Sequence, residues 1–308
     1  MRPTVWLASY PKSGNTWFRI VLANLDSPDA APADINALNG SDTIASARAR
    51  FDNHLLIESG LLTFAEIDLL RPGLYRHLAA DIFEDPFERE SRYPVRFVKT
   101  HDAYTLTNAG EAMMGGAHAA AGAILFVRDP RDVAASLANH QSVTIDKAIG
   151  LMADPAFAFC GSVRGLEIQL RQQLLGWSAF AESWLAQADI PVHLVRYEDL
   201  HRDPVGAVRG ALHFAGWRAT DADIAEAVGR ASIEELQRQE AKTGFGEAPP
   251  YREPGSRFFR RGKAGGWRDE LTAQQVLRIE RDHVAMMKRL GYEPVREQED
   301  SDAHRQTG

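Results

Sequence analysis

The chain has 308 residues, of which 44% are apolar and 25% are charged, and its formal net charge is −7. This composition is typical of a globular protein, and the length suits one large domain. The negative charge argues against general nucleic-acid binding, and no apolar run reaches the roughly 18 residues of a membrane span. Cys160 is the only cysteine, which excludes an intramolecular disulfide. We expect it to be a buried small apolar side chain in a protein of the reducing cytoplasm.

Short runs rich in β-branched and aromatic residues predict buried parallel strands. They are Val5–Ala8, Val95–Val98, Ala123–Val127 and Val192–Arg196. Because the first begins so early, no signal peptide is expected. Helix-like segments follow or separate the strands, at Trp17–Leu25, Pro130–Asn139, Val163–Ala188, Pro204–Ala215, Asp221–Val228 and Ala273–Leu290. This alternation predicts an α/β fold with a central parallel sheet flanked by helices, and ligands bound beyond the carboxyl ends of the strands.

The stretch SYPKSGNTW (Ser9–Trp17) joins the first predicted strand to the first predicted helix through a polar turn. Such a turn presents backbone N–H groups and the positive end of a helix dipole, which together bind anions. Gly14 allows close approach of the backbone, and Lys12 adds a positive charge. Ser13 and Thr16 add hydroxyl donors. The Walker A pattern G-x-x-x-x-G-K-[ST] does not occur here, and an ordinary polar turn is the alternative.

The stretch AILFVRDPRDVAASL places Arg128 at the carboxyl end of the third predicted strand. Ser136 follows about two helical turns later. A guanidinium in this place could bind a phosphate through two parallel hydrogen bonds. The alternative is surface ion pairing, either of Arg128 with Asp132 or of Arg131 with Asp129, which contributes little to stability.

Two more segments carry groups suited to chemistry on a phosphate-like ligand. In FFRRGKAGGWRDELT, Arg260 and Arg261 precede a glycine, which suits a phosphate-binding loop or an ordinary solvated basic loop. In VRFVKTHDAY, the second predicted strand ends in Lys99 and His101. A histidine in this position can act as a general base near neutral pH, or can serve the structure alone.

Together these segments resemble the sulfotransferases that use 3′-phosphoadenosine 5′-phosphosulfate (PAPS). YPKSGNTW is similar to the family's 5′-phosphosulfate loop, FVRDPRDVAAS to its 3′-phosphate motif, and RRGKAGGWRDELT to its Arg-Lys-Gly-x-x-Gly-Asp-Trp-Lys-Asn segment. VKTHDAY is similar to its Lys-Thr-His-Leu-Pro, and VRYEDL to its Tyr-Glu-Asp segment. The matches occur in family order from residue 5 to about 272. The resemblance implies a P-loop-like three-layer α/β fold.

The resemblance also implies which residues hold PAPS and its product, 3′-phosphoadenosine 5′-phosphate (PAP). The first turn would cradle the 5′-phosphosulfate, while Arg128, Ser136 and the basic loop would hold the 3′-phosphate. Trp17 would lie near the adenine, and Tyr197 would contact the nucleotide. Ser232 is less similar to an adenine-contacting position. The whole set is Lys12, Ser13, Gly14, Asn15, Thr16, Trp17, Arg128, Ser136, Tyr197, Ser232, Arg260, Arg261 and Gly262.

The catalytic residues implied by the resemblance are His101, Lys12 and Lys99. His101 would take the proton from an acceptor hydroxyl, and Lys12 would stabilise the leaving phosphate. His140 is the second candidate base. His283 falls on an apolar helix face and is expected to pack there. The histidines show no metal-ligand spacing, so no metal is expected.

The chain departs from the family pattern at several places. Asp102 and Ala103 stand where the family has Leu-Pro, and Gly266 stands where it has aspartate. A short dimer segment of some cytosolic members, Lys-x-x-x-Thr-Val-x-x-x-Glu, is not matched by Arg268, Thr272, Ala273 and Leu277. A homo-oligomer is therefore not expected to form in that way.

We expect one sulfotransferase domain over residues 1–295. Segments 26–92 and 140–165 are interpreted as insertions on the acceptor side, and 241–266 as a loop that closes over the nucleotide. The polar tail, 296–308, is expected to be disordered.

A small molecule with a hydroxyl group is the expected acceptor, although no motif identifies it. Asn36–Thr43, Phe157 and Phe159 could shape its pocket, or could be ordinary loop and core residues. Two other functions fit part of the pattern, namely an adenine-nucleotide P-loop kinase that uses magnesium and a non-catalytic nucleotide-binding protein. The missing Walker A lysine position and the 3′-phosphate motifs argue against the kinase.

Overall fold

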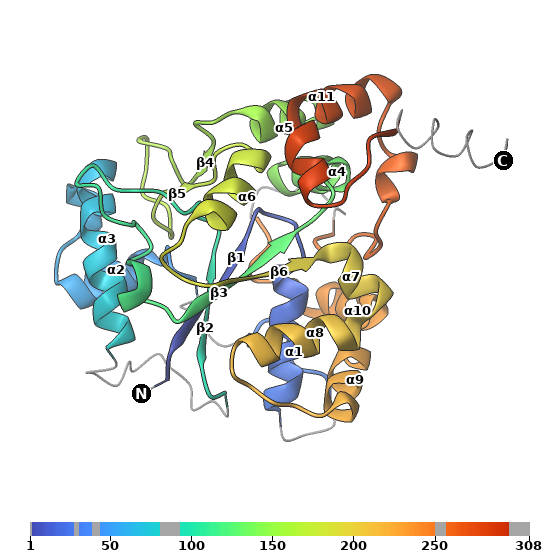
Figure 1. Ribbon diagram of the computed structural model, residues 1–308, viewed down its shortest axis with the longest axis horizontal. Helices are drawn as coiled ribbons and strands as arrows, with labels where there is room; N and C mark the ends of the chain where they lie inside the picture. The colour runs from blue at the N-terminus through green and yellow to red at the C-terminus, as the bar shows by residue number, and fades with distance from the viewer. Residues whose placement is uncertain (1, 28–30, 39–43, 81–92, 250–256, 296–308) are drawn as a thin grey trace, which may run out of the picture.

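The computed structural model describes residues 2–27, 31–38, 44–80, 93–249 and 257–295. Within these ranges, four parallel strands form one sheet in the order β2-β1-β3-β6 (Figure 1). The strands are β1 (Thr4–Ser9), β2 (Arg96–Thr100), β3 (Gly122–Val127) and β6 (Val192–Arg196). The four predicted strands are therefore confirmed. Because they run parallel, their carboxyl ends meet at one edge of the sheet, where a ligand is expected to bind.

Two apolar layers cover the faces of the sheet, as the alternation along β1 shows. Trp6 and Ala8 pack into one core cluster, and Val5 and Leu7 pack into the other. Helices of the first layer are α2 (Arg48–Leu55), α3 (Phe64–Ala79), α4 (Pro130–Gln141), α5 (Ile145–Ala153), α6 (Trp177–Ala186) and α11 (Ala273–Arg289). Helices of the second are α1 (Asn15–Asp26), α7 (Tyr197–Arg202), α8 (Pro204–Phe214), α9 (Asp221–Gly229) and α10 (Ile233–Thr243). The three-layer α/β prediction is confirmed.

Local sequence explains where the predicted helices begin. At α4, the Asp129 carboxylate accepts a hydrogen bond from the Arg131 N–H, and Pro130 occupies the first helical position. At α11, Thr272 and Gln275 form a reciprocal capping box. Gly291 follows this helix at a φ of 76°, a conformation that favours glycine.

One predicted helix, Val163–Ala188, is largely wrong, because only its last part forms α6. Before α6, β5 (Gln172–Gln173) pairs antiparallel with β4 (Ala158–Phe159). The Gln173 N–H donates to the Asp102 carboxylate, and the Gln173 carbonyl accepts from the Ala103 N–H. These tertiary hydrogen bonds hold the segment extended and override its helical pattern, and Val163 is left 87% exposed.

The remaining described elements are three short 3-10 helices, η2 (Ser59–Leu61), η3 (Gly116–His118) and η4 (Gly266–Asp269). None of the helices in the described ranges is long and apolar enough to cross a membrane. Cys160 is half-buried at a φ of 53°, so the expected full burial is wrong. It directly follows the two-residue strand β4. The predicted polar tail lies outside the described residues.

Candidate active site

The turn between β1 and α1 has the backbone shape of an anion-binding loop. Lys12 and Gly14 have φ values of 71° and 103°, and Gly14 begins α1 without a side-chain cap. The first N–H groups of the helix therefore remain available to a ligand. A Cβ on Gly14 would come within 3.0 Å of the Tyr197 ring, so glycine is needed for space as well as for φ. The Ser13 hydroxyl is buried and has no hydrogen-bond partner among the described residues.

Arg128 links this turn to two other predicted segments. Its guanidinium donates to the Lys12 carbonyl and to the Lys263 carbonyl, both at 3.2 Å, and lies 4.0 Å from the centre of the Tyr197 ring. The distance from Arg128 Nη2 to Asp132 Oδ2 is 3.9 Å, which is too long for a hydrogen bond. Arg128 is thus placed at the carboxyl edge of the sheet, and its long ion pair with Asp132 is largely buried rather than at the surface.

The two aspartates that follow Arg128 in the same motif have structural partners. Asp132 accepts from the N–H groups of Gly265 and Trp267, at 2.7 and 2.8 Å. Asp129 and Arg131 form a pair that is buried, not at the surface, and Arg131 also binds Glu280 at 2.7 Å. These contacts fasten the basic loop and α11 to α4.

The basic loop is held against α10 by hydrogen bonds along its backbone. Gln237 donates to the carbonyls of Phe259 and Arg260, at 3.0 and 2.7 Å, and Glu240 accepts from the Phe258 and Phe259 N–H groups. The Lys12 ammonium lies 3.5 Å from the centre of the Phe258 ring. The loop therefore lies next to the turn between β1 and α1 (residues 10–14, the phosphate turn). Its predicted phosphate ligands are Arg260, paired with Glu270 at 2.5 Å, Arg261, paired with Asp269 at 3.3 Å, and Gly262, at a φ of 57°.

The other predicted nucleotide residues lie around α1. The Trp17 indole N–H donates to the Ala231 carbonyl at 3.0 Å, so Trp17 lies beside the predicted Ser232. The Ser232 hydroxyl caps α10 by accepting from the Glu235 N–H. Thr16 is half-buried in the first turn of α1, and Ser136 is half-buried on α4. The structure therefore brings most of the predicted set to one edge of the sheet.

Asn15 differs from the predicted arrangement in its side-chain direction. Its amide points into the protein, where Nδ2 donates to the Leu7 carbonyl at 2.7 Å and to the Ser9 hydroxyl at 3.2 Å. The backbone N–H of Asn15 belongs to the first turn of α1, where helix N–H groups have no intrahelical partner. The side chain thus ties the turn to β1.

His101 lies just beyond the end of β2, next to the start of the turn. Its Nδ1 is 2.7 Å from the Ser9 carbonyl, which can only accept, so Nδ1 carries the proton. The other ring nitrogen, Nε2, then has a lone pair. Burial, with the positive charge of Lys99 as a further cause, lowers the pKa of His101 to about 3. The ring is therefore neutral at pH 7, and the same burial that keeps it neutral disfavours its protonated form.

The sulfotransferase domain family matches residues 2–291, which is most of the chain. The chain belongs to this family. It is accordingly a sulfotransferase, a transferase of sulfur-containing groups. Cytosolic sulfotransferases 16 and 17 of Arabidopsis thaliana are each 23% identical to it, over 296 and 288 residues. The alignments cover 91% and 89% of this chain and 75% and 71% of the relatives.

Solved structures share the fold of this sulfotransferase. A retinol dehydratase in complex with androsterone and the inactive cofactor PAP has a TM-score of 0.56 at 20% identity, covering 94% of this chain and 82% of its own. Mouse sulfotransferase SULT7A1 complexed with PAP has a TM-score of 0.55 at 19% identity, covering 92% and 84%. The P-loop-like α/β architecture is thus that of known sulfotransferases.

A partly buried ionic cluster of this sulfotransferase adjoins His101. It contains the predicted Lys99, but the partners of Lys99 were missed in the sequence. Lys99 Nζ lies 3.0 Å from Glu247 Oε2, and Arg19 Nη1 lies 2.6 Å from Glu247 Oε1. Burial alone would raise the pKa of Glu247, but the charges of Lys99 and Arg19 lower it to about 2. For Lys99, burial outweighs the attraction of Glu247 and lowers its pKa. No motif signals this cluster, since its members lie far apart in the chain.

Aromatic side chains also lie near His101. The ring centres of His101 and Phe159 are 6.4 Å apart, and those of Phe157 and Phe159 are 5.5 Å apart. His140, the second candidate base, lies 6.0 Å from Phe159 and 6.1 Å from Phe258. The predicted pocket segment Asn36–Thr43 is described only to residue 38. His283 packs elsewhere, against Trp177, with its Nδ1 2.9 Å from Ser178 Oγ.

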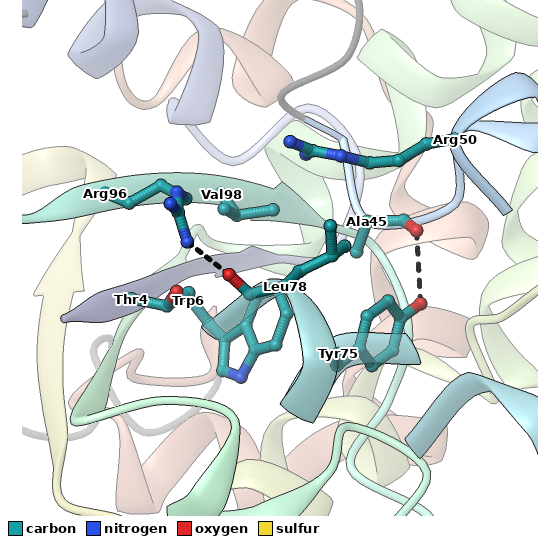
Figure 2. A pocket seen from close by; sticks show the side chains of 8 residues that line it. All are labelled: Thr4, Trp6, Ala45, Arg50, Tyr75, Leu78, Arg96 and Val98. Atoms are coloured by element: carbon teal, nitrogen blue, oxygen red, sulfur yellow. Dashed lines mark hydrogen bonds between the residues drawn. The ribbon is translucent and has the colours of Figure 1, made fainter. Parts of the chain in front are cut away.

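A small cavity of about 20 Å³ opens elsewhere, between the sheet and α3, and Figure 2 shows the residues that line it. Thr4 and Trp6 come from β1, and Arg96 and Val98 come from β2. This volume can hold about one water molecule, which is far too little for a nucleotide. Within the described ranges, no group of three or more His, Cys, Asp or Glu side chains could hold a metal ion.

Proposed function

We propose that this sulfotransferase transfers the sulfuryl group of PAPS to the hydroxyl of a small-molecule acceptor in the cytoplasm. The observation that carries the proposal is the link between the phosphate turn and a neutral histidine. Ser9 ends β1 where the turn begins, and its carbonyl accepts the hydrogen bond that fixes the His101 tautomer. A group held at the turn and a base at His101 are therefore positioned by the same residue.

The residues around the turn suit a nucleotide with phosphates at both ends of its ribose. The uncapped start of α1, the Ser13 hydroxyl and Lys12 would hold the 5′-phosphosulfate. Arg128, Ser136 and the loop Arg260–Gly262 would hold the 3′-phosphate, and Trp17, Tyr197 and Ser232 would border the nucleoside. The two PAP complexes among the related structures support this choice of co-substrate.

The chemistry of transfer follows from the positions of His101 and Lys12. PAPS supplies the activated sulfuryl group. His101 Nε2 accepts the proton of the acceptor hydroxyl, whose oxygen forms the new S–O bond. The bond between sulfur and the 5′-phosphate oxygen breaks, and the negative charge stays on the phosphate of PAP. Lys12 stabilises this charge, and Lys99 adds positive potential from the acceptor side.

The acceptor class is proposed from the aromatic residues near His101 and from the relatives. Phe157 and Phe159 present an apolar wall beside the base, which suits the carbon skeleton of a small molecule. Related retinol dehydratase structures hold androsterone in one case and retinol in the other, and both names denote small molecules. The cytoplasmic location is proposed from the names of the Arabidopsis relatives.

The test combines ligand binding with product formation in the purified protein. PAP without magnesium is expected to raise the melting temperature more than ATP does, with or without magnesium. Donor labelled with ³⁵S is expected to transfer label to members of a panel of small-molecule alcohols and phenols. His101→Ala should lower the transfer rate by about 10²–10⁴-fold and leave PAP binding nearly unchanged. The matched control is His118→Ala, at an exposed histidine.

Each alternative function predicts a different result in the same assays. A P-loop kinase would respond to ATP with magnesium and transfer phosphate from it. A non-catalytic nucleotide-binding protein would bind PAP and transfer no label to any acceptor. Full turnover in His101→Ala would remove His101 as the base and make His140 the next residue to replace.

A further inference from the structure

The residues on either side of His101 are fully buried and hydrogen-bonded within the protein. Thr100, Asp102 and Ala103 are each 0% exposed, whereas His101 between them is half-buried. The Asp102 N–H donates to the Thr100 hydroxyl at 3.0 Å, and the Asp102 carbonyl accepts from the Trp184 indole at 3.1 Å. His101 is therefore the residue of this segment that reaches the site, and its neighbours are locked in the core.

Asp102, the residue that departs from the family's leucine, has both carboxylate oxygens satisfied inside the protein. Arg71 of α3 donates to Oδ1 at 3.1 Å and also to Oδ2, which makes a two-pronged ion pair. The Gln173 N–H donates to Oδ1 at 3.0 Å. A buried carboxylate needs such partners, because an unpaired charge in the core is strongly unfavourable.

Arg71 also starts a chain of hydrogen bonds that reaches the residues before His101. Its Nε donates to the Tyr75 hydroxyl at 2.8 Å, and Tyr75 donates to the Ala45 carbonyl at 3.1 Å. The Ala45 N–H in turn donates to the Lys99 carbonyl at 2.8 Å. The network thus contacts the chain two residues before His101, at Lys99, and immediately after it, at Asp102.

We propose that Arg71 and Asp102 are positioning residues that hold the His101 ring in its reactive orientation, an inference that rests on the function proposed above. A buried ion pair contributes little net stability compared with an apolar pair of similar volume. Its two-pronged geometry, however, fixes the direction of both partners. A base must stay within about 0.5 Å of its productive position, and this pair supplies that constraint from behind the site.

The test replaces the pair by apolar residues of similar size and measures the ring and the rate separately. In Arg71→Met/Asp102→Leu no buried charge is left unpaired, so the double variant is expected to fold. With ¹⁵N-labelled histidine, NMR should show His101 in the native protein as one tautomer with Nδ1 protonated. In the double variant, it should show both tautomers in exchange. The turnover rate should fall by about 10²-fold, with the KM for PAPS nearly unchanged.

The controls separate positioning from general stability. Arg289→Met/Glu182→Leu removes an exposed ion pair between α11 and α6 and should change neither readout. Arg71→Lys keeps the charge but not the two-pronged geometry, and it should show the same tautomer exchange even if the apolar pair does not fold. A single native tautomer in either folded variant would overturn the proposal. The NMR readout needs neither donor nor acceptor, so it distinguishes failure of this inference from failure of the proposed function.

Discussion

The turn at residues 10–14 and the segment at residues 100–103 follow neighbouring strands of one sheet, yet their polar groups are used in opposite ways. In the turn, α1 begins without a side-chain cap, and the buried Ser13 hydroxyl has no partner among the described residues. In the segment, both Asp102 oxygens are bound by groups of the protein itself. Since buried polar groups are normally satisfied, the first arrangement is suited to a ligand and the second to rigidity.

This contrast explains which kind of substitution should affect which property. Removal of a side chain whose main partner is a ligand should affect folding little, but should affect binding or rate strongly. A side chain that satisfies an internal charge affects folding first. The four predictions below test this division, beginning with the largest expected effect.

Lys12→Ala should lower the transfer rate by about 10²–10³-fold, because the charge that develops on the leaving phosphate loses its stabilising cation. Folding should change less than the rate does, since a cation–π contact such as that of Lys12 with Phe258 contributes only about 0.5–1 kcal/mol. Single-turnover kinetics with labelled PAPS and thermal melts measure the two effects. Lys242→Ala, at an exposed position of α10, is the control. A loss of stability as large as the loss of rate would contradict the division.

Arg128→Ala should weaken PAP binding by about 10–100-fold, the effect expected for losing a charge-assisted hydrogen bond to a phosphate. Adenosine 5′-monophosphate, which lacks the 3′-phosphate, should bind almost as well as before. Isothermal titration calorimetry with both nucleotides measures the ratio, and Arg202→Ala, whose side chain is 76% exposed in the native protein, is the control. Equal weakening of both nucleotides would assign Arg128 to the 5′ side.

The same division describes what the sequence could predict. The turn, Arg128 and the basic loop follow strands or begin helices, so short-range patterns sufficed to bring them to one edge of the sheet. The Arg71–Asp102 and Lys99–Glu247 pairs join residues far apart in the chain, and no local pattern encodes such a pairing. The departure of Asp102 from the family's leucine was visible in the sequence, but its partner on α3 was not.

The prediction of secondary structure was limited in the same way by contacts between distant parts of the chain. The strands and capped helices were predictable because apolar runs and cap residues act locally. The predicted helix Val163–Ala188 failed where Gln173 exchanges hydrogen bonds with Asp102 and Ala103, which belong to another part of the chain. Tertiary contacts outweighed local preference at the place where the chain supports His101.

Glu247→Gln should lower stability by about 1–2 kcal/mol at pH 7, because Lys99 and Arg19 lose the carboxylate that pairs with them. The pKa of Glu247 is lowered from 4.5 to about 2, so its contribution to stability is present above pH 4.5 and is lost as the pH falls toward 2. Urea denaturation between pH 2 and pH 7 should therefore show a shallower acid loss in Glu247→Gln. Glu58→Gln, at an exposed site, should keep the native pH profile. An unchanged profile in Glu247→Gln would show that the pair is not formed in solution.

Gly262→Ala tests the basic loop, which belongs to the ligand-binding side but is packed like a structural element. Its φ of 57° disfavours any residue with a Cβ, and an added Cβ would lie 2.7 Å from Ile233 Cγ1. Gly216→Ala is a matched control, because Gly216 has a φ of 78° with no atom within 4 Å of the added Cβ. Both variants should lose about 1 kcal/mol of stability from the backbone alone. Only Gly262→Ala should also weaken PAP binding, by about fivefold, because the loop must move away from α10 and the phosphate turn. Calorimetry with PAP on both variants measures this difference, and equal affinities would place Gly262 outside the nucleotide site.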